Sequence, residues 1–291
     1  MAKATERLTI LKTSKLYIGG KFVRTESGRS LQVVDGDGKH RSNVCWASRK
    51  DLREAVRAAR AAQSGWASDS AYLRSQILYR MAEMLEDRRS SFEEELAHHS
   101  TQKQAETEVQ TSIDRLVAYA GWCDKLTAVF GSVNPVSSPH FNFTVPEPTG
   151  VVGIVCPETP ALLAMVSLLA SALVPGNAVV LLASDKHPLA GAAMAEVLAT
   201  SDVPGGVVNI LTGKQDELLE VMAGHLDVNA IVAATSDPNR RGILQTQGAA
   251  NVKRVTFTDL EGDAWFVDDA ADPYQILQTV EMKTTWHPVG V

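Results

Sequence analysis

Five short apolar runs between residues 150 and 258 constrain the fold of this chain more than any other feature. Each run has the length of a strand, and helical stretches separate them. The runs lie at 150–156, 178–183, 207–211, 229–234 and 253–258. Continuous apolar strands that alternate with helices are typical of a parallel sheet covered on both faces. We therefore predict an α/β fold in which residues 150–277 form a doubly wound, Rossmann-like, NAD-binding-type domain.

Residues 1–130 predict a layer of strands and helices that packs on this sheet. LYIGGKFV (16–23) alternates around a Gly-Gly turn, which is typical of a β-hairpin. Ser48 and Asp51 form a capping-box pattern, which predicts that a helix begins there. Two longer apolar stripes with a period near 3.6 follow, so the layer is mainly helical.

Residues 131–149 and 278–291 predict a protruding antiparallel element. FNFTV (141–145) and QTVEMKTTW (278–286) both alternate apolar with polar side chains. Edge strands of this kind pair with another chain unless they are blunted. We therefore predict an oligomerisation interface made of Phe141, Phe143, Val145, Val280, Met282 and Trp286.

Composition excludes several classes of protein. Among 291 residues, 28 are basic and 34 acidic, with no dense Lys/Arg run, so we expect no nucleic-acid partner. The longest apolar stretch, 161–174, is shorter than the roughly 20 residues of a membrane span, and the N-terminus lacks a signal-peptide core. Three widely spaced cysteines form neither a disulfide framework nor a metal motif. We expect a cytoplasmic protein without a metal site.

The usual phosphate-binding loops are missing from the predicted nucleotide fold. A GxGxxG loop is expected after the first strand, but the chain reads Cys156-Pro157-Glu158-Thr159-Pro160 there. The two prolines remove backbone N–H donors that a pyrophosphate requires. A GxxxxGK[ST] loop is absent as well.

Several blocks of sequence, in the same order, nevertheless resemble the aldehyde dehydrogenase superfamily over roughly residues 8–262. LYIGGKFV resembles the entry strand pair, and EPTGVVGIVCPETPALL resembles the segment that opens the cofactor domain. VPGGVVNILTG and HLDVNAIVAATSD resemble two of the βα units that follow. LTILKTSKLYIGGKF and MKTTWHPVG resemble more specifically the non-catalytic C-terminal unit of family-16 aldehyde dehydrogenases, here as a free-standing chain.

The resemblance also implies cofactor positions, and these are altered in this chain. The Lys that contacts the adenosine ribose in the family corresponds to Leu182, which has no donor. The Gly-Ser-Thr turn that contacts the pyrophosphate reads Thr235-Ser236-Asp237, and Asp237 would repel a phosphate. We therefore assign no working NAD site. The vestigial positions are Thr159, Leu182, Asp185, Gly213 and Ser236.

The catalytic groups that the resemblance implies are missing too. Thr159 replaces the oxyanion-binding Asn, and Thr258 replaces the general-base Glu. The family's nucleophilic Cys lies in a separate domain beyond that Glu, but here no cysteine follows Cys156. The 33 residues after Thr258 are too few for such a domain, and they run to EMKTTW, which resembles the family's terminal strand. Within them, AWFV (264–267) predicts an edge strand.

These observations predict a catalytically silent aldehyde dehydrogenase-like protein that acts in assembly. Its partner would be a full-length aldehyde dehydrogenase or a second copy of the chain. One alternative is the NAD-binding half of a split aldehyde oxidoreductase. The features that support this alternative are Asp185, Gly213 and Ser236. Another is a small-molecule sensor that uses the vestigial crevice. We expect Cys156 to be structural, because the neighbouring Glu158 disfavours a thiolate.

Overall fold

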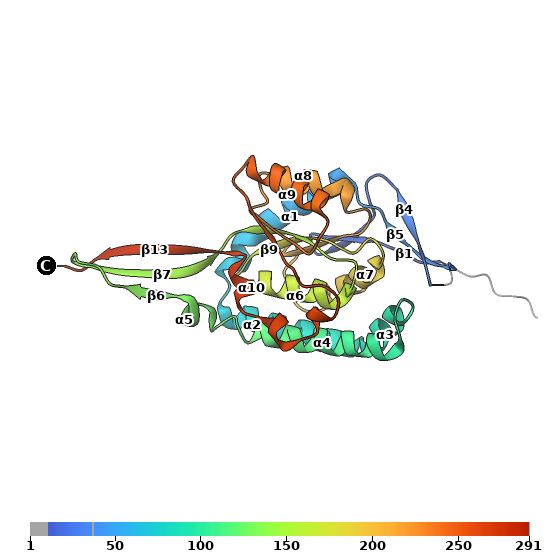
Figure 1. Cartoon of the computed structure of the whole chain (residues 1–291), viewed down its shortest axis with the longest axis horizontal. Helices are drawn as coiled ribbons and strands as arrows, with labels where there is room; N and C mark the ends of the chain where they lie inside the picture. Colours follow the sequence, from blue (N-terminus) through green and yellow to red (C-terminus); the bar gives the residue numbers. More distant parts are fainter. Residues whose placement is uncertain (1–10, 37, 291) are drawn as a thin grey trace, which may run out of the picture.

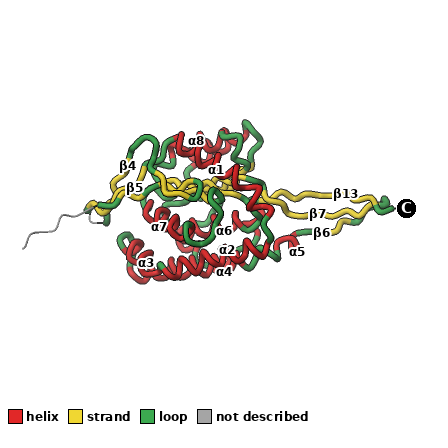
Figure 2. The backbone as a smooth tube through the Cα atoms, turned by 180° about the vertical axis from the view of Figure 1, so that it is seen from behind, coloured by secondary structure: helices red, strands yellow, loops and turns green. Residues whose placement is uncertain are grey.

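The computed structural model describes residues 11–36 and 38–290 as a layered body with a long arm (Figure 1). A seven-stranded sheet forms the middle layer of the body, and helices lie on both of its faces. The arm is a separate three-stranded sheet that projects from one end of the body (Figure 2). The predicted α/β, doubly wound fold is therefore confirmed.

The central sheet has the order β12-β11-β8-β9-β10-β2-β3, and its first five strands are parallel. These five are β8 (Val151–Val155), β9 (Ala178–Leu182), β10 (Val208–Leu211), β11 (Ala230–Ala233) and β12 (Arg254–Phe257). Four of these strands, β8 to β11, are buried along their whole length. This burial explains why their sequences are continuous apolar runs. The chain leaves β8 toward β9 and later returns to its other side as β11, so β8 marks the topological switch point.

The helices bury apolar stripes against the two faces of this sheet. One core contains side chains of α2 (Ala71–Asp87), α4 (Gln102–Ala120), α6 (Ala161–Leu173) and α7 (Pro188–Leu198). The other contains side chains of α1 (Arg49–Ser68), α8 (Asp216–Gly224) and α9 (Pro238–Ala249). Every residue of α6 is buried, because α4 covers the side that faces away from the sheet. The short helices α3 (Arg89–Ala97) and α5 (Leu126–Phe130) flank α4.

The N-terminal strands differ in part from their prediction. β2 (Leu16–Ile18) and β3 (Lys21–Val23) form the predicted hairpin, but β2 pairs with β10 and so extends the central sheet instead of packing on it. The Asn209 amide oxygen accepts the Gly19 N–H at 2.9 Å and fixes this junction. A second small sheet contains β1 (Thr13–Ser14), β4 (Ser30–Val34) and β5 (His40–Cys45). The predicted capping box begins α1 at Ser48.

The arm consists of β6 (Ser132–Asn134), β7 (His140–Pro148) and β13 (Val280–Pro288) in the order β13-β7-β6. The predicted antiparallel pairing of the two distant segments is therefore confirmed. The register places Phe143 opposite Thr285, and Met282 opposite Pro146. Opposed residues of an antiparallel pair lie on one face, so Phe141, Phe143 and Val145 face away from Met282 and Trp286.

Residues 258–279 connect the central sheet to the arm through a packed segment. It contains the short helices η1 (Gly262–Trp265), η2 (Asp268–Ala271) and α10 (Tyr274–Leu277). The edge strand predicted for 264–267 is therefore wrong. The reason is that Trp265 turns inward and is completely buried in the core that also contains side chains of α4 and α6, which a strand at the sheet edge would not allow.

Candidate functional site

Two neighbouring cavities lie at the carboxyl edge of the central sheet, where a doubly wound fold binds its ligands. The switch-point cavity has a volume of about 600 Å³, and its lining includes Pro157, Thr159, Ser236, Arg240, Thr258 and Glu261. The α4 cavity has a volume of about 640 Å³, and its lining includes His99, Thr107, Glu108, Thr159, His187 and Phe266. Thr159 and Gly262 line both, so the start of α6 and the connecting segment lie between them.

The helix starts at this edge are occupied by carboxylates of the protein itself. Glu108 Oε1 accepts hydrogen bonds from the backbone N–H groups of Leu162 and Leu163 at 2.7 and 3.2 Å, in the first turn of α6. Asp237 is the N-cap of α9 and accepts the N–H of Asn239 at 2.9 Å. Free N–H groups at helix starts are the usual binding site for phosphate. In this chain the carboxylates of Glu108 and Asp237 already accept N–H groups at the starts of α6 and α9.

The same arrangement recurs before α7 and α8. Glu158 accepts the N–H of Lys186 at 3.0 Å and the hydroxyl of Ser184 at 2.6 Å. Asp185 accepts the N–H of Gln215 at 2.9 Å. The carboxylate of Asp185, one of the vestigial cofactor positions, is therefore bound within the chain. Burial is the largest cause that raises the pKa of Asp185 above its ordinary value.

Gln215 closes the space between the ends of β8 and β9. Its side-chain N–H group donates to the carbonyls of Cys156 and Ala183 at 2.8 and 3.0 Å. Its carbonyl accepts from Arg240 at 2.9 Å, and Arg240 forms an ion pair with Asp216 at 2.7 Å. This network ties the starts of α8 and α9 together across the switch point.

The structure separates the five vestigial positions. Thr159 and Ser236 line the switch-point cavity, and Asp185 lies beside it in the Gln215 network. Leu182 is buried within the sheet, so it cannot contact a ligand. Gly213 has a φ of +137°, and a Cβ there would lie 2.9 Å from Trp46 Cδ1. Packing against Trp46 is therefore a sufficient reason for this glycine.

The residues at the switch point do not fit NAD. A pyrophosphate requires N–H donors and positive charge, but the helix starts at this edge carry carboxylates. The lining holds four acidic side chains against two basic ones, and Arg240 is already paired with Asp216. The acidic residues are Glu158, Asp216, Asp237 and Glu261. We therefore derive no chemical step through this cofactor.

Two of the buried cysteines have a raised pKa. Cys156 is buried, and its pKa is raised by burial and by the nearby Glu158 charge. Burial also raises the pKa of Cys123 to about 12. Within residues 11–36 and 38–290, no group of three His, Cys, Asp or Glu side chains is arranged to hold a metal ion.

The α4 cavity contains titratable groups that the sequence reading did not single out. Glu108 is only 8% exposed, and burial raises its pKa. Burial lowers the pKa of His99 and of His187. The centroids of these two rings lie 4.4 Å apart. A signal for Glu108 was present, because it lies three residues after Ala105 and four before Ser112 on the buried side of α4.

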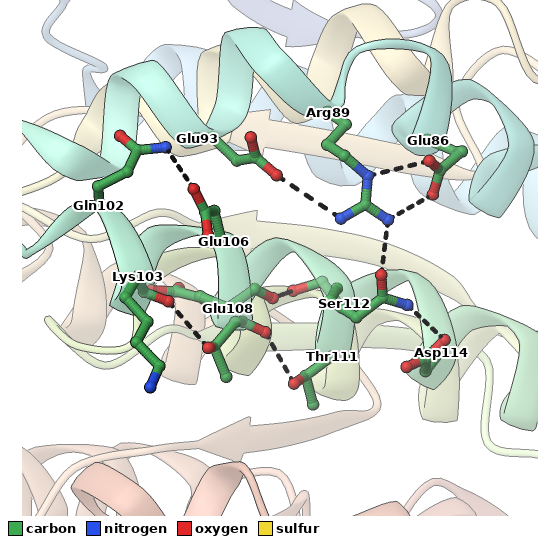
Figure 3. Close-up of polar contacts among 12 residues, drawn as sticks. Glu86, Arg89, Glu93, Gln102, Lys103, Glu106, Glu108, Thr111, Ser112 and Asp114 are labelled. Carbon is green, nitrogen blue, oxygen red and sulfur yellow. Dashed lines mark hydrogen bonds and ion pairs between the residues drawn. The ribbon is translucent and has the colours of Figure 1, made fainter.

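Hydrogen bonds and ion pairs join α4 to α2 and α3 (Figure 3). Arg89 forms ion pairs with Glu86 at 2.6 Å and Glu93 at 3.6 Å and donates to Gln110 at 2.7 Å, which ties α2 and α3 to α4. The Ser112 hydroxyl donates to the carbonyl of Glu108 at 2.6 Å. The segment between α3 and α4 lines one wall of the cavity through His99, Ser100 and Thr101.

The fold and its carboxyl edge define a doubly wound α/β protein of the nucleotide-binding type with a projecting β arm. The sequence profile of the aldehyde dehydrogenase family matches residues 22–288, and the chain belongs to that family. It is 33% identical over 266 residues to the putative aldehyde dehydrogenase DhaS of Bacillus subtilis (strain 168), covering 87% of this chain and 52% of that protein. It is 30% identical over 259 residues to omega-crystallin of Enteroctopus dofleini, covering 84% and 50%.

Solved structures agree with this assignment. The crystal structure of PnpE from Pseudomonas sp. WBC-3 superposes with a TM-score of 0.80 at 27% identity, covering 86% of this chain and 51% of that one. The chain thus spans about half the length of the relatives it matches. In the described part of the chain, no helix is both long enough and apolar enough to cross a membrane. The closer likeness to the family-16 unit stays a prediction.

Proposed function

We propose that this chain is a non-catalytic member of the aldehyde dehydrogenase family that acts as an assembly or regulatory subunit. It binds through its arm to a full-length aldehyde dehydrogenase or to a second copy of itself. The observation that carries the proposal is the exposure of the arm on both faces. A three-stranded sheet with no covering layer cannot bury its own apolar side chains.

The exposed apolar residues of the arm support this proposal. Phe141 is 45% exposed on one face, and Met282 and Trp286 are 48% and 57% exposed on the other. Val280 differs from them, because it is buried in the core and anchors the arm to the body. Val133 is 68% exposed and pairs with Phe143 on the face of Phe141, so each face of the arm carries exposed apolar side chains suited to a partner.

The edge of the arm also supports pairing with another chain. β13 is the outer strand, so one side of its backbone is not paired within the arm. Its two charged side chains are neutralised inside the chain: Glu281 pairs with Arg254 at 2.9 Å, and Lys283 pairs with Glu147 at 3.0 Å. Charges of this kind otherwise discourage strand addition, so the edge remains suited to it.

The packed connection 258–279 supports the non-catalytic part of the proposal. The family resemblance implies a catalytic domain between β12 and β13, and here Trp265 and Ile276 fill that connection as completely buried residues. The Arg115 guanidinium donates to the carbonyls of Ala270 and Trp265 at 2.6 and 2.9 Å. The segment thus has its own core contacts and leads directly from the sheet to the arm.

The test is the assembly state of purified protein, measured by light scattering, with affinity capture from the source cells. We expect an oligomer, or a stoichiometric complex with a full-length aldehyde dehydrogenase. Met282→Arg and Phe143→Pro should each reduce it to a monomer. Leu226→Arg is the matched control, because Leu226 is also an exposed apolar residue but lies between α8 and β11. A monomeric wild-type chain that captures no such enzyme would refute the proposal.

A further inference from the structure

The α4 cavity contains a buried carboxylate of which only one oxygen is bonded. Glu108 Oε1 accepts both N–H groups at the start of α6. Oε2 has no hydrogen-bond partner among residues 11–36 and 38–290. It is also not one of the described polar atoms that are sealed from solvent without a partner. Because Glu108 lines the α4 cavity, this oxygen faces the cavity.

No described Lys or Arg forms an ion pair with Glu108. A buried carboxylate without a counter-charge is costly, and the two backbone hydrogen bonds offset that cost only in part. Burial accordingly raises the pKa of Glu108, while those two hydrogen bonds act in the opposite direction. A cation placed at Oε2 would supply the missing counter-charge.

The rest of the wall is mostly apolar or neutral. Leu96, Pro160 and Phe266 provide apolar surface, and the two histidine rings form one side. A volume of about 640 Å³ lies within the range of small-molecule sites. The charged side chains in the lining are Glu108 and Asp263 against Lys103, so the acidic groups outnumber the basic one.

We propose that the α4 cavity binds a small organic ammonium compound. The ammonium group donates to Glu108 Oε2, and the apolar part of the ligand lies against Pro160 and Phe266. This site is separate from the switch-point cavity and from the arm, so it does not depend on the assembly proposal. It also gives the carboxyl edge of the sheet a preference for cations, opposite to that of a phosphate site.

Benzylamine, benzyl alcohol and benzoate are suitable probes, because they share one apolar body and differ in charge. Titration calorimetry and thermal melts of the full chain would measure binding. We expect benzylamine to bind and to raise the melting temperature, with the other two at least about tenfold weaker, which is 1.4 kcal/mol. Preferred binding of benzoate would indicate that Lys103 dominates the cavity and would overturn the proposal.

Glu108→Gln is the decisive variant, since its amide oxygen can still accept from α6 while the charge is lost. It should reduce benzylamine affinity at least about tenfold and leave benzyl alcohol unchanged. Glu106→Gln is the matched control on the exposed side of the same helix. Thr107 lines the cavity, so Thr107→Trp should block all three probes by filling it. Equal benzylamine affinity in the wild type and Glu108→Gln would refute the proposal, and so would benzylamine binding that survives Thr107→Trp.

Discussion

Replacing Arg115 by Met tests whether the connection 258–279 is held in place by one buried side chain. Arg115 is buried, and its guanidinium donates to Ala270 and Trp265 carbonyls and to the Ser167 hydroxyl. Met fills a similar volume but cannot donate. The variant therefore leaves the Trp265 carbonyl without this donor, whereas the Ala270 carbonyl keeps a hydrogen bond from the Gln275 side chain at 3.2 Å.

The size of the effect follows from these contacts. A buried acceptor that loses its donor costs about 1–3 kcal/mol. The Trp265 carbonyl loses its donor, whereas Ser167 keeps its own bond to the Leu163 carbonyl at 2.7 Å. Removing a buried guanidinium also relieves its desolvation, which offsets part of the loss. We expect the free energy of unfolding to fall by about 1–3 kcal/mol.

Urea denaturation measures this change, and limited chymotrypsin digestion measures where the chain opens. In Arg115→Met, cleavage at Trp265 and Phe266 should accelerate, because the carbonyls of the segment are no longer held. Arg57→Met is the control, since Arg57 is exposed and pairs with Glu54 one turn away. Its effect should stay below about 0.5 kcal/mol. Equal stability of the two variants, or unchanged cleavage at Trp265, would refute the reasoning.

Three further predictions concern single residues. Val252 is 93% exposed with a φ of +57°, so Val252→Asn should raise the free energy of unfolding by about 1 kcal/mol in urea melts. Gly213→Ala should lower it by about 1–3 kcal/mol, with or without NAD, because the new methyl group meets Trp46. Burial raises the pKa of Glu108 above its ordinary 4.5, so the folded state binds that proton more tightly. The stability of the wild type relative to Glu108→Gln should therefore fall as the pH rises above 4.5; a constant difference between the two would contradict this.

The sequence predicts the central sheet well because each strand is encoded locally. Strands buried on both faces must be apolar throughout, and that pattern is visible in β8 and β9 without any knowledge of their neighbours. The pairing of β2 with β10 was not predictable in this way. It depends on Asn209, whose partner Gly19 is 190 residues away in the chain. A hairpin pattern indicates its own turn but not the strand beside which it lies.

The short apolar run at 264–267 shows a second limit of local patterns. Four residues with no clear alternation fit an edge strand or a buried turn equally well. The deciding contact comes from Arg115, which lies 150 residues earlier in the chain and donates a hydrogen bond to the carbonyl of Trp265. The role of Glu108 was hidden for the same reason, since its partners on α6 lie 54 and 55 residues further along.

Asp237 illustrates how the changes at this edge depend on one another. Its charge predicts repulsion of a phosphate, and in the structure it also caps α9 by accepting the N–H of Asn239. Helix starts are stabilised by negative charge whether it comes from a ligand or from the protein. Exchanging Asp237 alone would therefore remove a cap, while Gln215 would still close the space between β8 and β9. At this edge the helix starts are stabilised by carboxylates of the chain itself. Glu108 at α6 and Asp237 at α9 take the place that a bound phosphate could otherwise occupy.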